Sequence, residues 1–264
     1  MKHILIKIEY KGTRYCGWQI QPNTVTVQQT IQGVFQQICQ TPISIKACSR
    51  TDSGVHAIGQ VASVEIPEHL ALNKLFRSVN SLLPEDIAVT DLVEIPADYN
   101  LRQHAAGKRY IYRVLQSPIL RVFEAETHLL VKSVLDIDKA RHAIMDLRGT
   151  HDFSAFRGRG CQQPDPVKTI SYSAIDTQQV DEYATIAFVF EGSGFLKNMI
   201  RIMVGSLLDI ARGKKKENSI RDALTSGDRS DAGLTAPAKG LVLDRIFLQP
   251  DPFKLRTLGG WEND

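Results

Sequence analysis

Cysteine is scarce in this sequence of 264 residues, and no two of its four cysteines form a C-x-x-C pair. The pattern does not favour a zinc site or a disulfide framework, so we expect thiols in a reducing cytosol. They are Cys16, Cys39, Cys48 and Cys161. An excess of one charge is also missing: Lys+Arg 32 against Asp+Glu 29 leaves a net charge of +3. Bulk charge therefore does not indicate a nucleic-acid-binding protein.

Long apolar runs are absent as well. The longest, residues 195–210, contains Lys197, Asn198, Arg201 and Asp209, which excludes a membrane span. Met1 leads directly into an alternating segment, so we expect no signal peptide. The sequence has no dinucleotide-binding loop, P-loop or metal-ligand cluster. With 43% hydrophobic residues, the chain can bury one large core or two ordinary ones.

The first half of the chain has a clear order of predicted elements. Residues 3–10 alternate as a strand does, with every second residue apolar, and residues 43–48, 58–66 and 87–95 are also predicted strands. Apolar residues recur at helical spacing in residues 27–38 and 72–83, and Pro84 ends the second helix. The sum is β-α-β-β-α-β, the ferredoxin-like split arrangement.

The second half has the same predicted order. Strands are predicted at residues 109–116, 167–175, 183–190 and 241–248, and helices at 137–147, 195–212 and 219–225. We predict an α+β fold of two ferredoxin-like halves, residues 1–105 and 106–264, sharing a mostly antiparallel sheet with a central cleft. The alternative is a single α/β domain, but short strands paired around a tight turn argue against a fully parallel sheet.

Residues 49–57 read SRTDSGVHA and lie between two predicted strands. Asp-Ser-Gly is typical of a turn, because Asp can cap its own backbone and Gly supplies positive φ. Arg50 precedes Asp52 by two residues, which predicts a charge pair that keeps the carboxylate ionised and aimed, as a nucleophile requires. The alternative is a hairpin tip whose Asp side chain only satisfies its own loop.

Basic residues cluster locally despite the small net charge, and we predict that these clusters contact RNA phosphates. They are Lys108, Arg109, Arg157, Arg159 and Lys197, with Arg201 one helical turn after Lys197. In residues 158–160, Gly and Arg together allow the backbone to approach phosphate closely. The lysine run at residues 214–216 has an alternative role as compensation of a helix dipole on a solvated face.

The segment RTDSGVHAIGQV at residues 50–61 resembles the active-site motif of the tRNA pseudouridine synthase A (TruA) family. The resemblance covers essentially the whole chain. It recurs in KIEYKGTRYCGWQ (7–19), NSLLPEDI (80–87), KRYIY (108–112), DFSAFR (152–157), GFLKNMIR (194–201) and APAKGL (236–241). Departures are Ser49 for Gly, residues 101–105 for A-R-x-S-A, Lys108 for Arg and Asn198 for His.

This resemblance implies isomerisation of uridine to pseudouridine at positions 38 to 40 of the tRNA anticodon stem-loop, without cofactor or metal. It implies that Asp52 is the nucleophile, attacking either the ribose anomeric carbon or carbon 6 of a flipped base. Arg50, Tyr110 and Arg201 take supporting positions, with Tyr110 at the family's active-site tyrosine. The expected partner is tRNA, bound by a cytoplasmic homodimer.

Two further interpretations of the sequence belong to other functional classes. A noncatalytic RNA-binding module would carry RNP-like strings such as K-G-F-G-F, and this chain has none. A glycoside hydrolase needs two carboxylates flanking one bond, and no second acid is apparent near Asp52. A synthase acting on other RNA sites is the closest competitor. His56 and His104 are not assigned to catalysis, because a lone His is more often hydrogen-bonded structure.

Overall fold

The computed structural model describes residues 1–254, and its chain divides into two compact units. The first contains Met1–Ala106 together with the chain from Leu243, and the second is Gly107–Val242. The predicted halves end near the same place, but the compact units differ from them because the last strand returns to the first unit. The assignment of the halves themselves stays a prediction.

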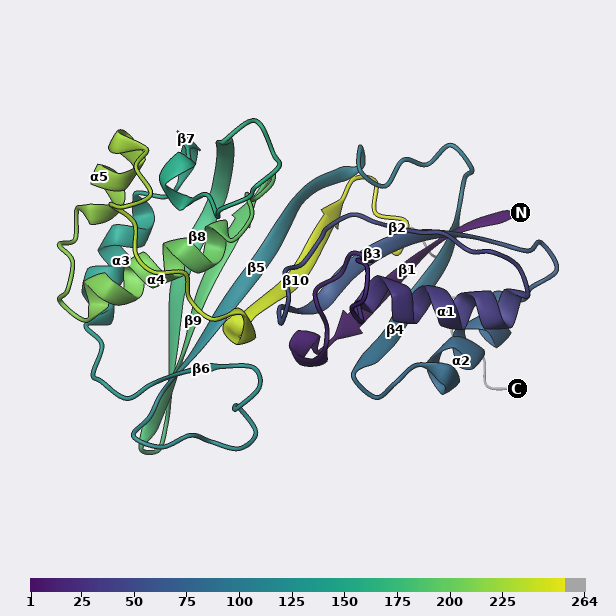
Figure 1. Ribbon diagram of the computed structural model, residues 1–264, viewed down its shortest axis with the longest axis horizontal. Helices are drawn as coiled ribbons and strands as arrows, with labels where there is room; N and C mark the ends of the chain where they lie inside the picture. Colours follow the sequence, from purple (N-terminus) through teal and green to yellow (C-terminus); the bar gives the residue numbers. More distant parts are fainter. Residues whose placement is uncertain (255–264) are drawn as a thin grey trace. The chain divides into compact units, whose positions relative to one another are not determined.

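The first unit has the predicted ferredoxin-like order. Its elements are β1 (Lys2–Tyr10), α1 (Val27–Cys39), β2 (Ile45–Ala47), β3 (His56–Ile66), α2 (Leu72–Leu82) and β4 (Ile87–Ile95). The strands run in the order β4-β1-β3, with β2 antiparallel to β3, and β1 pairs antiparallel with both neighbours. Helices α1 and α2 lie side by side on one face of these strands (Figure 1).

Capping residues set the two ends of α1, and strand β1 forms the buried centre of this unit. Thr26 caps the helix by accepting a hydrogen bond from the Gln29 N–H at 3.3 Å, and Gln40 ends it in the left-handed conformation. Ile4, Leu5 and Ile6 of β1 are fully buried, as expected for a central strand. Burying one aliphatic side chain stabilises the fold by about 2 kcal/mol, so this strand is a main source of stability.

From β5 onward the chain has the same order of elements with two extra strands. The elements from here on are β5 (Ala105–Gln116), β6 (Leu129–Val131), α3 (Ile137–Met145), β7 (Gly149–Asp152), β8 (Val167–Val180), β9 (Tyr183–Gly192), α4 (Met199–Ala211), α5 (Ser219–Ser226) and β10 (Leu241–Leu248). The strands run β5-β9-β8-β7 in antiparallel pairs, and β6 is parallel to β5. Helices α3, α4 and α5 pack together beside β8 and β9 (Figure 1).

Strand β10 completes the first unit. It lies beside β3, where Gly59 approaches it so closely that an added Cβ would stand 2.2 Å from the Asp244 carbonyl oxygen. The structure confirms the α+β class and the mostly antiparallel pairing, and the alternative of a parallel α/β sheet is wrong.

Several predicted boundaries need correction. The predicted strand 43–48 shortens to Ile45–Ala47. The predicted strand 167–175 extends to Val180, and the sequence pattern misses this extension because residues 176–179 are polar and exposed on both faces. The predicted helix 195–212 begins only at Met199, because Asn198 has a φ of 59°. The sequence pattern does not predict strands β6 and β7, since three or four residues are too few for an apolar pattern.

Candidate active site

Asp52 stands in a tight turn between β2 and β3. The Val55 N–H donates to the Asp52 carbonyl at 3.1 Å, and Gly54 at the third position has a φ of 76°. A positive φ at that position is what a type II turn requires, and glycine adopts it without steric cost. The Asp52 side chain is half-buried and the preceding Thr51 is buried. The predicted Asp-Ser-Gly turn is therefore present.

The opening segment of the chain holds this turn in place. The Trp18 N–H donates to the Thr51 carbonyl at 3.1 Å, and the Gly54 N–H donates to the Tyr15 carbonyl at 3.3 Å. Gly17 has a φ of 86°, and a Cβ there would stand 2.6 Å from the Thr51 oxygen. The Y-x-G-x-x-Y-x-G-W-Q segment is thus a backbone support for the turn that carries Asp52.

Two tyrosines and the tryptophan of that segment also have structural partners. The Tyr10 hydroxyl and the Thr51 hydroxyl are 2.8 Å apart, and the Tyr10 and Trp18 rings pack with centroids 6.0 Å apart. The Tyr15 hydroxyl donates to the Asp86 carboxylate at 2.6 Å. Trp18 is only 2% exposed, which favours core packing over base stacking.

His56 has a structural role, as expected for a lone histidine. Its Nδ1 accepts a hydrogen bond from the Gly12 N–H at 3.1 Å, and its side chain is buried. A Cβ on Gly12 would stand 2.0 Å from the Val55 oxygen, so the short 3₁₀ helix Gly12–Arg14 presses against the end of the turn. His56 joins these segments.

Arg50 precedes Asp52 by two residues, and the ion pair that this spacing predicts stays a prediction. The Arg50 side chain is exposed. The neighbouring Ser49, which replaces the family's glycine, is buried, and its carbonyl accepts from the Gln60 amide at 2.9 Å. Backbone hydrogen bonds with Tyr15 and Trp18 thus help to position the turn.

Tyr110 lies on β5 in the second unit. It is 7% exposed, and its ring meets the edge of Phe195 with centroids 5.4 Å apart. Phe195 precedes α4, so the tyrosine of the K-R-Y-x-Y motif and the start of the G-F-L-x-x-M-I-R motif are in contact. Both motifs are visible in the sequence, but their pairing is not.

Arg201 lies in the first turn of α4 and is fixed by two acceptors. Its Nε donates to the Ala236 carbonyl at 2.7 Å and its Nη1 to the Asn198 side-chain oxygen at 2.9 Å. Asn tolerates the left-handed conformation that ends the preceding turn, and it also orients the guanidinium. The departure from the family's histidine therefore preserves a polar partner for Arg201.

The A-P-A-x-G-L segment is the shared acceptor of this group. Besides Ala236, the Pro237 carbonyl accepts from the Tyr112 hydroxyl at 2.8 Å. Gly240 lets the segment lie against the Tyr112 ring, since a Cβ would stand 2.7 Å from it. Burial raises the pKa of Tyr112 well above its ordinary value, against the opposing effect of Arg201. Tyr112, Tyr15 and Asp86 are supports that sequence reasoning does not single out, although each stands in a family motif.

The five predicted RNA-binding residues differ in what they can offer a phosphate. Arg159 and Lys197 are exposed, whereas Lys108 is half-buried on β5. Arg109 forms an ion pair with Glu191, the residue opposite it on β9, at 2.5 Å. Arg157 donates to backbone carbonyls of its own loop. Because Arg109 is charge-compensated and Arg157 is hydrogen-bonded within its own loop, the exposed Arg159 and Lys197 are the residues best placed to contact a phosphate.

The segment that departs most from the family, residues 101–105, closes a loop of the first unit. His104 stacks on Tyr99 with ring centroids 4.2 Å apart, and its Nδ1 is 2.8 Å from the Asn100 carbonyl oxygen. Leu101 is buried. These contacts make His104 part of a packed loop, which agrees with leaving it out of the catalytic assignment.

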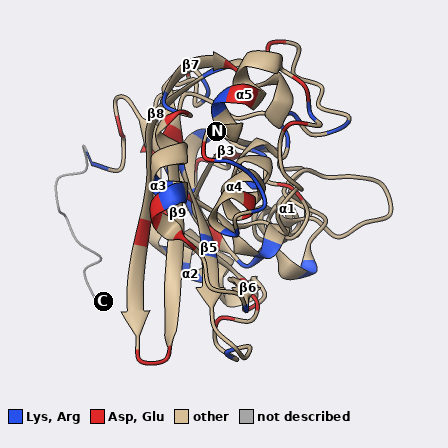
Figure 2. Cartoon of the chain, turned by 90° about the vertical axis from the view of Figure 1, so that its left-hand side faces the viewer, with Lys and Arg blue, Asp and Glu red and all other residues tan. Residues whose placement is uncertain are grey.

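Acidic residues mark surfaces unsuited to phosphate. The turn joining β8 and β9 is Asp181-Glu182, coloured red at the tip of that hairpin (Figure 2).

Among residues 1–254, no group of three or more His, Cys, Asp or Glu side chains is arranged to hold a metal ion. In the same part of the chain, no helix has the length and apolar character needed to cross a bilayer.

Comparison with known proteins supplies the family. The tRNA pseudouridine synthase family matches residues 6–102 and 143–247. A tRNA pseudouridine synthase A from Myxococcus xanthus is 39% identical, covering 98% of this chain and 97% of that protein. Another from Geotalea uraniireducens is 38% identical, covering 94% of this chain and 100% of that protein. The chain therefore belongs to the tRNA pseudouridine synthase A family of isomerases.

Proposed function

We propose that this synthase converts uridine to pseudouridine at positions 38 to 40 of the tRNA anticodon stem-loop, with Asp52 as nucleophile. The observation that supports Asp52 most is the tight turn held by Trp18 and Gly54 backbone hydrogen bonds, which leaves a half-buried carboxylate on a fixed backbone. A carboxylate held in this way meets the requirement for an attacking group of defined position.

The proposed reaction breaks the glycosidic bond between ribose and N1 of uracil and forms one between ribose and carbon 5. The proton on carbon 5 is released and N1 ends protonated, so the reaction is redox-neutral. Asp52 attacks the ribose anomeric carbon or carbon 6 of the base, and its bond to the substrate breaks when the product forms. Either attack requires a base outside the helical stack, which costs a few kcal/mol.

Supporting roles are proposed for three other side chains. Tyr110 would stack on the uracil, and Arg201, already oriented by Ala236 and Asn198, would supply a positive charge to the reacting groups. Arg50, an exposed guanidinium two residues before the nucleophile, would hold the Asp52 carboxylate ionised and oriented toward the substrate. Lys108, Arg109, Arg157, Arg159 and Lys197 are proposed to serve RNA binding, directly or through neighbours.

The proposed assembly and location follow the resemblance. We place the enzyme in the cytoplasm as a homodimer that binds tRNA. Because the contacts are to phosphates, binding should weaken steeply as salt rises.

The test is tritium release from tRNA carrying carbon-5-tritiated uridine, with wild type compared with Asp52→Asn. The substitution keeps the size of the side chain and removes its charge. We expect release by wild type alone, with tRNA affinity retained in the variant. Appreciable turnover by Asp52→Asn would exclude the nucleophile role, and tight binding without release by wild type would point to a binding module.

A further inference from the structure

Arg157 uses its guanidinium to fold its own loop. It follows the 3₁₀ helix Ser154–Phe156, and its Nη2 donates to the Cys161 carbonyl at 3.0 Å and to the Gln163 carbonyl. One nitrogen therefore closes residues 157–163 into a compact loop. A guanidinium engaged by two carbonyls of the same loop has fewer donors left for a phosphate.

The same loop is fastened to the turn that precedes α4. The Gly158 N–H donates to the Lys197 carbonyl at 2.8 Å. A Cβ on Gly158 would stand 2.7 Å from that oxygen and 2.9 Å from the Asn198 Cβ, so only glycine allows this approach.

Cys161 lies in the same loop, and its carbonyl is one of the two that accept from Arg157. Burial acts to raise the pKa of its thiol, but hydrogen bonds from the Lys197 and Gln163 backbone and from Arg157 lower the pKa overall. The Gly158 hydrogen bond therefore joins the loop to the turn before α4.

This contact brings the Lys197 side chain close to the residue that follows Arg159. The Lys197 ammonium lies 3.9 Å from where a Cβ on Gly160 would stand, beside Arg159 in the chain. Within residues 1–254 neither Arg159 nor Lys197 forms an ion pair with a carboxylate. Two uncompensated cations held on a fixed backbone suit an anionic ligand such as an RNA phosphate.

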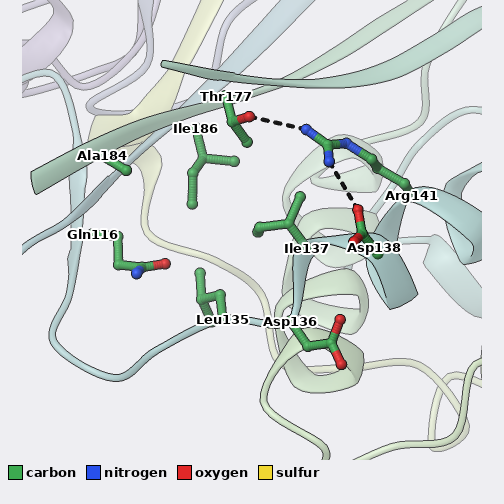
Figure 3. A pocket seen from close by; sticks show the side chains of 9 residues that line it. All are labelled: Gln116, Leu135, Asp136, Ile137, Asp138, Arg141, Thr177, Ala184 and Ile186. Atoms are coloured by element: carbon green, nitrogen blue, oxygen red, sulfur yellow. Dashed lines mark hydrogen bonds and ion pairs between the residues drawn. The ribbon is translucent and has the colours of Figure 1, made fainter. Parts of the chain in front are cut away.

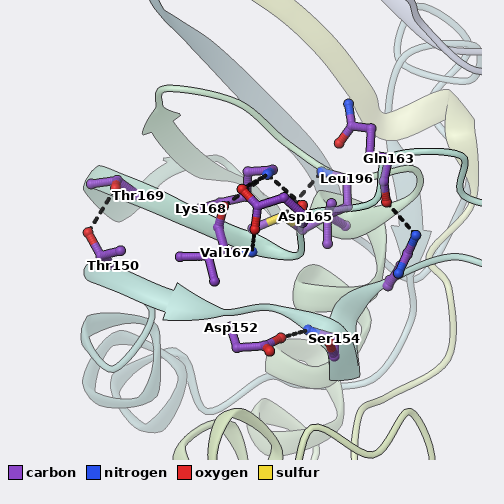
Figure 4. A network of polar contacts seen from close by, with 11 residues as sticks. Thr150, Asp152, Ser154, Gln163, Asp165, Val167, Lys168, Thr169 and Leu196 are labelled. Atoms are coloured by element: carbon purple, nitrogen blue, oxygen red, sulfur yellow. Dashed lines mark hydrogen bonds and ion pairs between the residues drawn. The ribbon is translucent and has the colours of Figure 1, made fainter.

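A neighbouring lysine lacks these properties. Lys168 donates to the Asp165 and Val167 carbonyls at 2.7 and 2.9 Å and lies 3.5 Å from the Asp165 carboxylate. It belongs to the network of polar contacts that also includes the Thr150–Thr169 pair on β7 and β8 (Figure 4). Its charge is compensated, which limits the surface to Arg159 and Lys197.

We propose that Arg157 is a positioning residue, and that the loop it folds holds Arg159 and Lys197 as one phosphate-binding surface for the RNA substrate. The proposal rests on the proposed function and gives Arg157 a different part from direct RNA contact. The surface is continuous with Arg201, because Asn198 follows Lys197 and accepts from the Arg201 guanidinium. Phosphate binding there would steady the first turn of α4, on which Arg201 stands.

The first experiment measures tRNA affinity against salt concentration for single and combined variants. Removing one cation that binds a phosphate lowers the slope of log affinity against log salt by about 1. We expect Arg159→Ala and Lys197→Ala to lower it by about 1 each, and Arg157→Ala alone to lower it by more than 1. Adding Arg157→Ala to the Arg159→Ala/Lys197→Ala double variant should change it no further. A further drop of about 1 would overturn the proposal, because Arg157 would then bind a phosphate itself.

Gly158→Ala is a second route to the same state. It leaves Arg157 in place but forces the loop away from Lys197, so we expect it to reproduce the slope of Arg157→Ala. The matched control is Arg141→Ala, because Arg141 in the same unit also donates to a backbone carbonyl, that of Ile175. Arg141 also pairs with Asp138, as Figure 3 shows. That variant loses the same charge and should keep the wild-type slope.

Amide hydrogen exchange without RNA tests the loop independently of function. In Arg157→Ala the amides of Gly158 and Cys161, which donate to Lys197 and Gly158, should exchange faster than in wild type and Arg141→Ala. Unchanged exchange would overturn the positioning role. If wild type formed no pseudouridine yet these amides lost protection, the proposed function would fail while the role of Arg157 in the loop stood.

Discussion

Tyr15 and Asp86 join two parts of the first unit that are 71 residues apart, with a hydrogen bond of 2.6 Å. Both residues stand in motifs that the sequence reveals, but no spacing rule predicts their contact, because it depends on how β1 and β4 pair. Asp52 is different: its turn follows from Asp-Ser-Gly alone. The predicted Arg50–Asp52 pair is a weaker inference, since two residues of separation do not fix where a long side chain points.

Tyr15→Phe should lower the free energy of unfolding by about 2 kcal/mol, as expected for a hydrogen bond to a charged group. The Asp86 side chain is only 9% exposed, so water cannot easily replace the missing donor. Urea unfolding at neutral pH measures the change. Tyr183→Phe is a suitable control, because Tyr183 lies at the half-exposed start of β9. A loss below about 0.5 kcal/mol would contradict the assigned strength of this bond.

The same variant has a signature in alkali. Burial, and then the hydrogen bond and charge of Asp86, raise the pKa of Tyr15 above its ordinary value of 10.0. A raised pKa in the folded state means that the stabilisation is present below pH 10 and is lost as pH rises further. Wild type should therefore lose stability above about pH 10 more steeply than Tyr15→Phe. Parallel pH profiles of the two proteins would contradict the assigned cause.

At the scale of elements, hydrophobic periodicity and helix-ending residues predict most helices and strands. The errors arise where one residue has an unusual backbone conformation or where a short strand depends on its partner. Helix α4 is buried on nearly all sides, so apolar residues extend the predicted helix to residue 195, and only the left-handed Asn198 moves its start. Strands β6 and β7 owe their conformation to pairing with β5 and β8. Such pairing is a long-range effect that local pattern does not contain.

The opening turn gives a sharp test of how one element supports another. Gly17→Ala places a Cβ 2.6 Å from the Thr51 carbonyl at a φ of 86°, so the turn carrying Asp52 must shift. A displacement of about 1 Å at a reacting group should lower kcat by roughly 10- to 100-fold. Steady-state kinetics and circular dichroism separate this loss from unfolding.

Gly33→Ala is the matched control for that change. Gly33 lies exposed in α1 with no atom within 4 Å of an added Cβ. It should keep wild-type activity and gain about 0.5–1 kcal/mol of stability. Equal kinetic losses in both variants would mean that contact between the opening segment and the turn is not what positions Asp52.

At the scale of the whole molecule, the element order and the α+β class follow from the sequence, because strand and helix periods repeat clearly in both halves. The division into compact units does not follow, since Leu243 onward returns to the first unit beside β3. Net charge is equally uninformative: +3 overall conceals that Arg109 is compensated by Glu191, while within residues 1–254 no ion pair compensates Arg159 or Lys197. Pairing across strands, not composition, decides which charges remain for a ligand.

Pseudouridine formation in the anticodon stem-loop through Asp52 can be measured directly. The most direct measurement is single-turnover tritium release from tRNA transcripts labelled at carbon 5 of one defined uridine. We predict release by wild type from labels at positions 38, 39 or 40, none from labels elsewhere, and none by Asp52→Asn at any position. Release from a label outside the anticodon stem-loop, or release by Asp52→Asn, would contradict the proposed function.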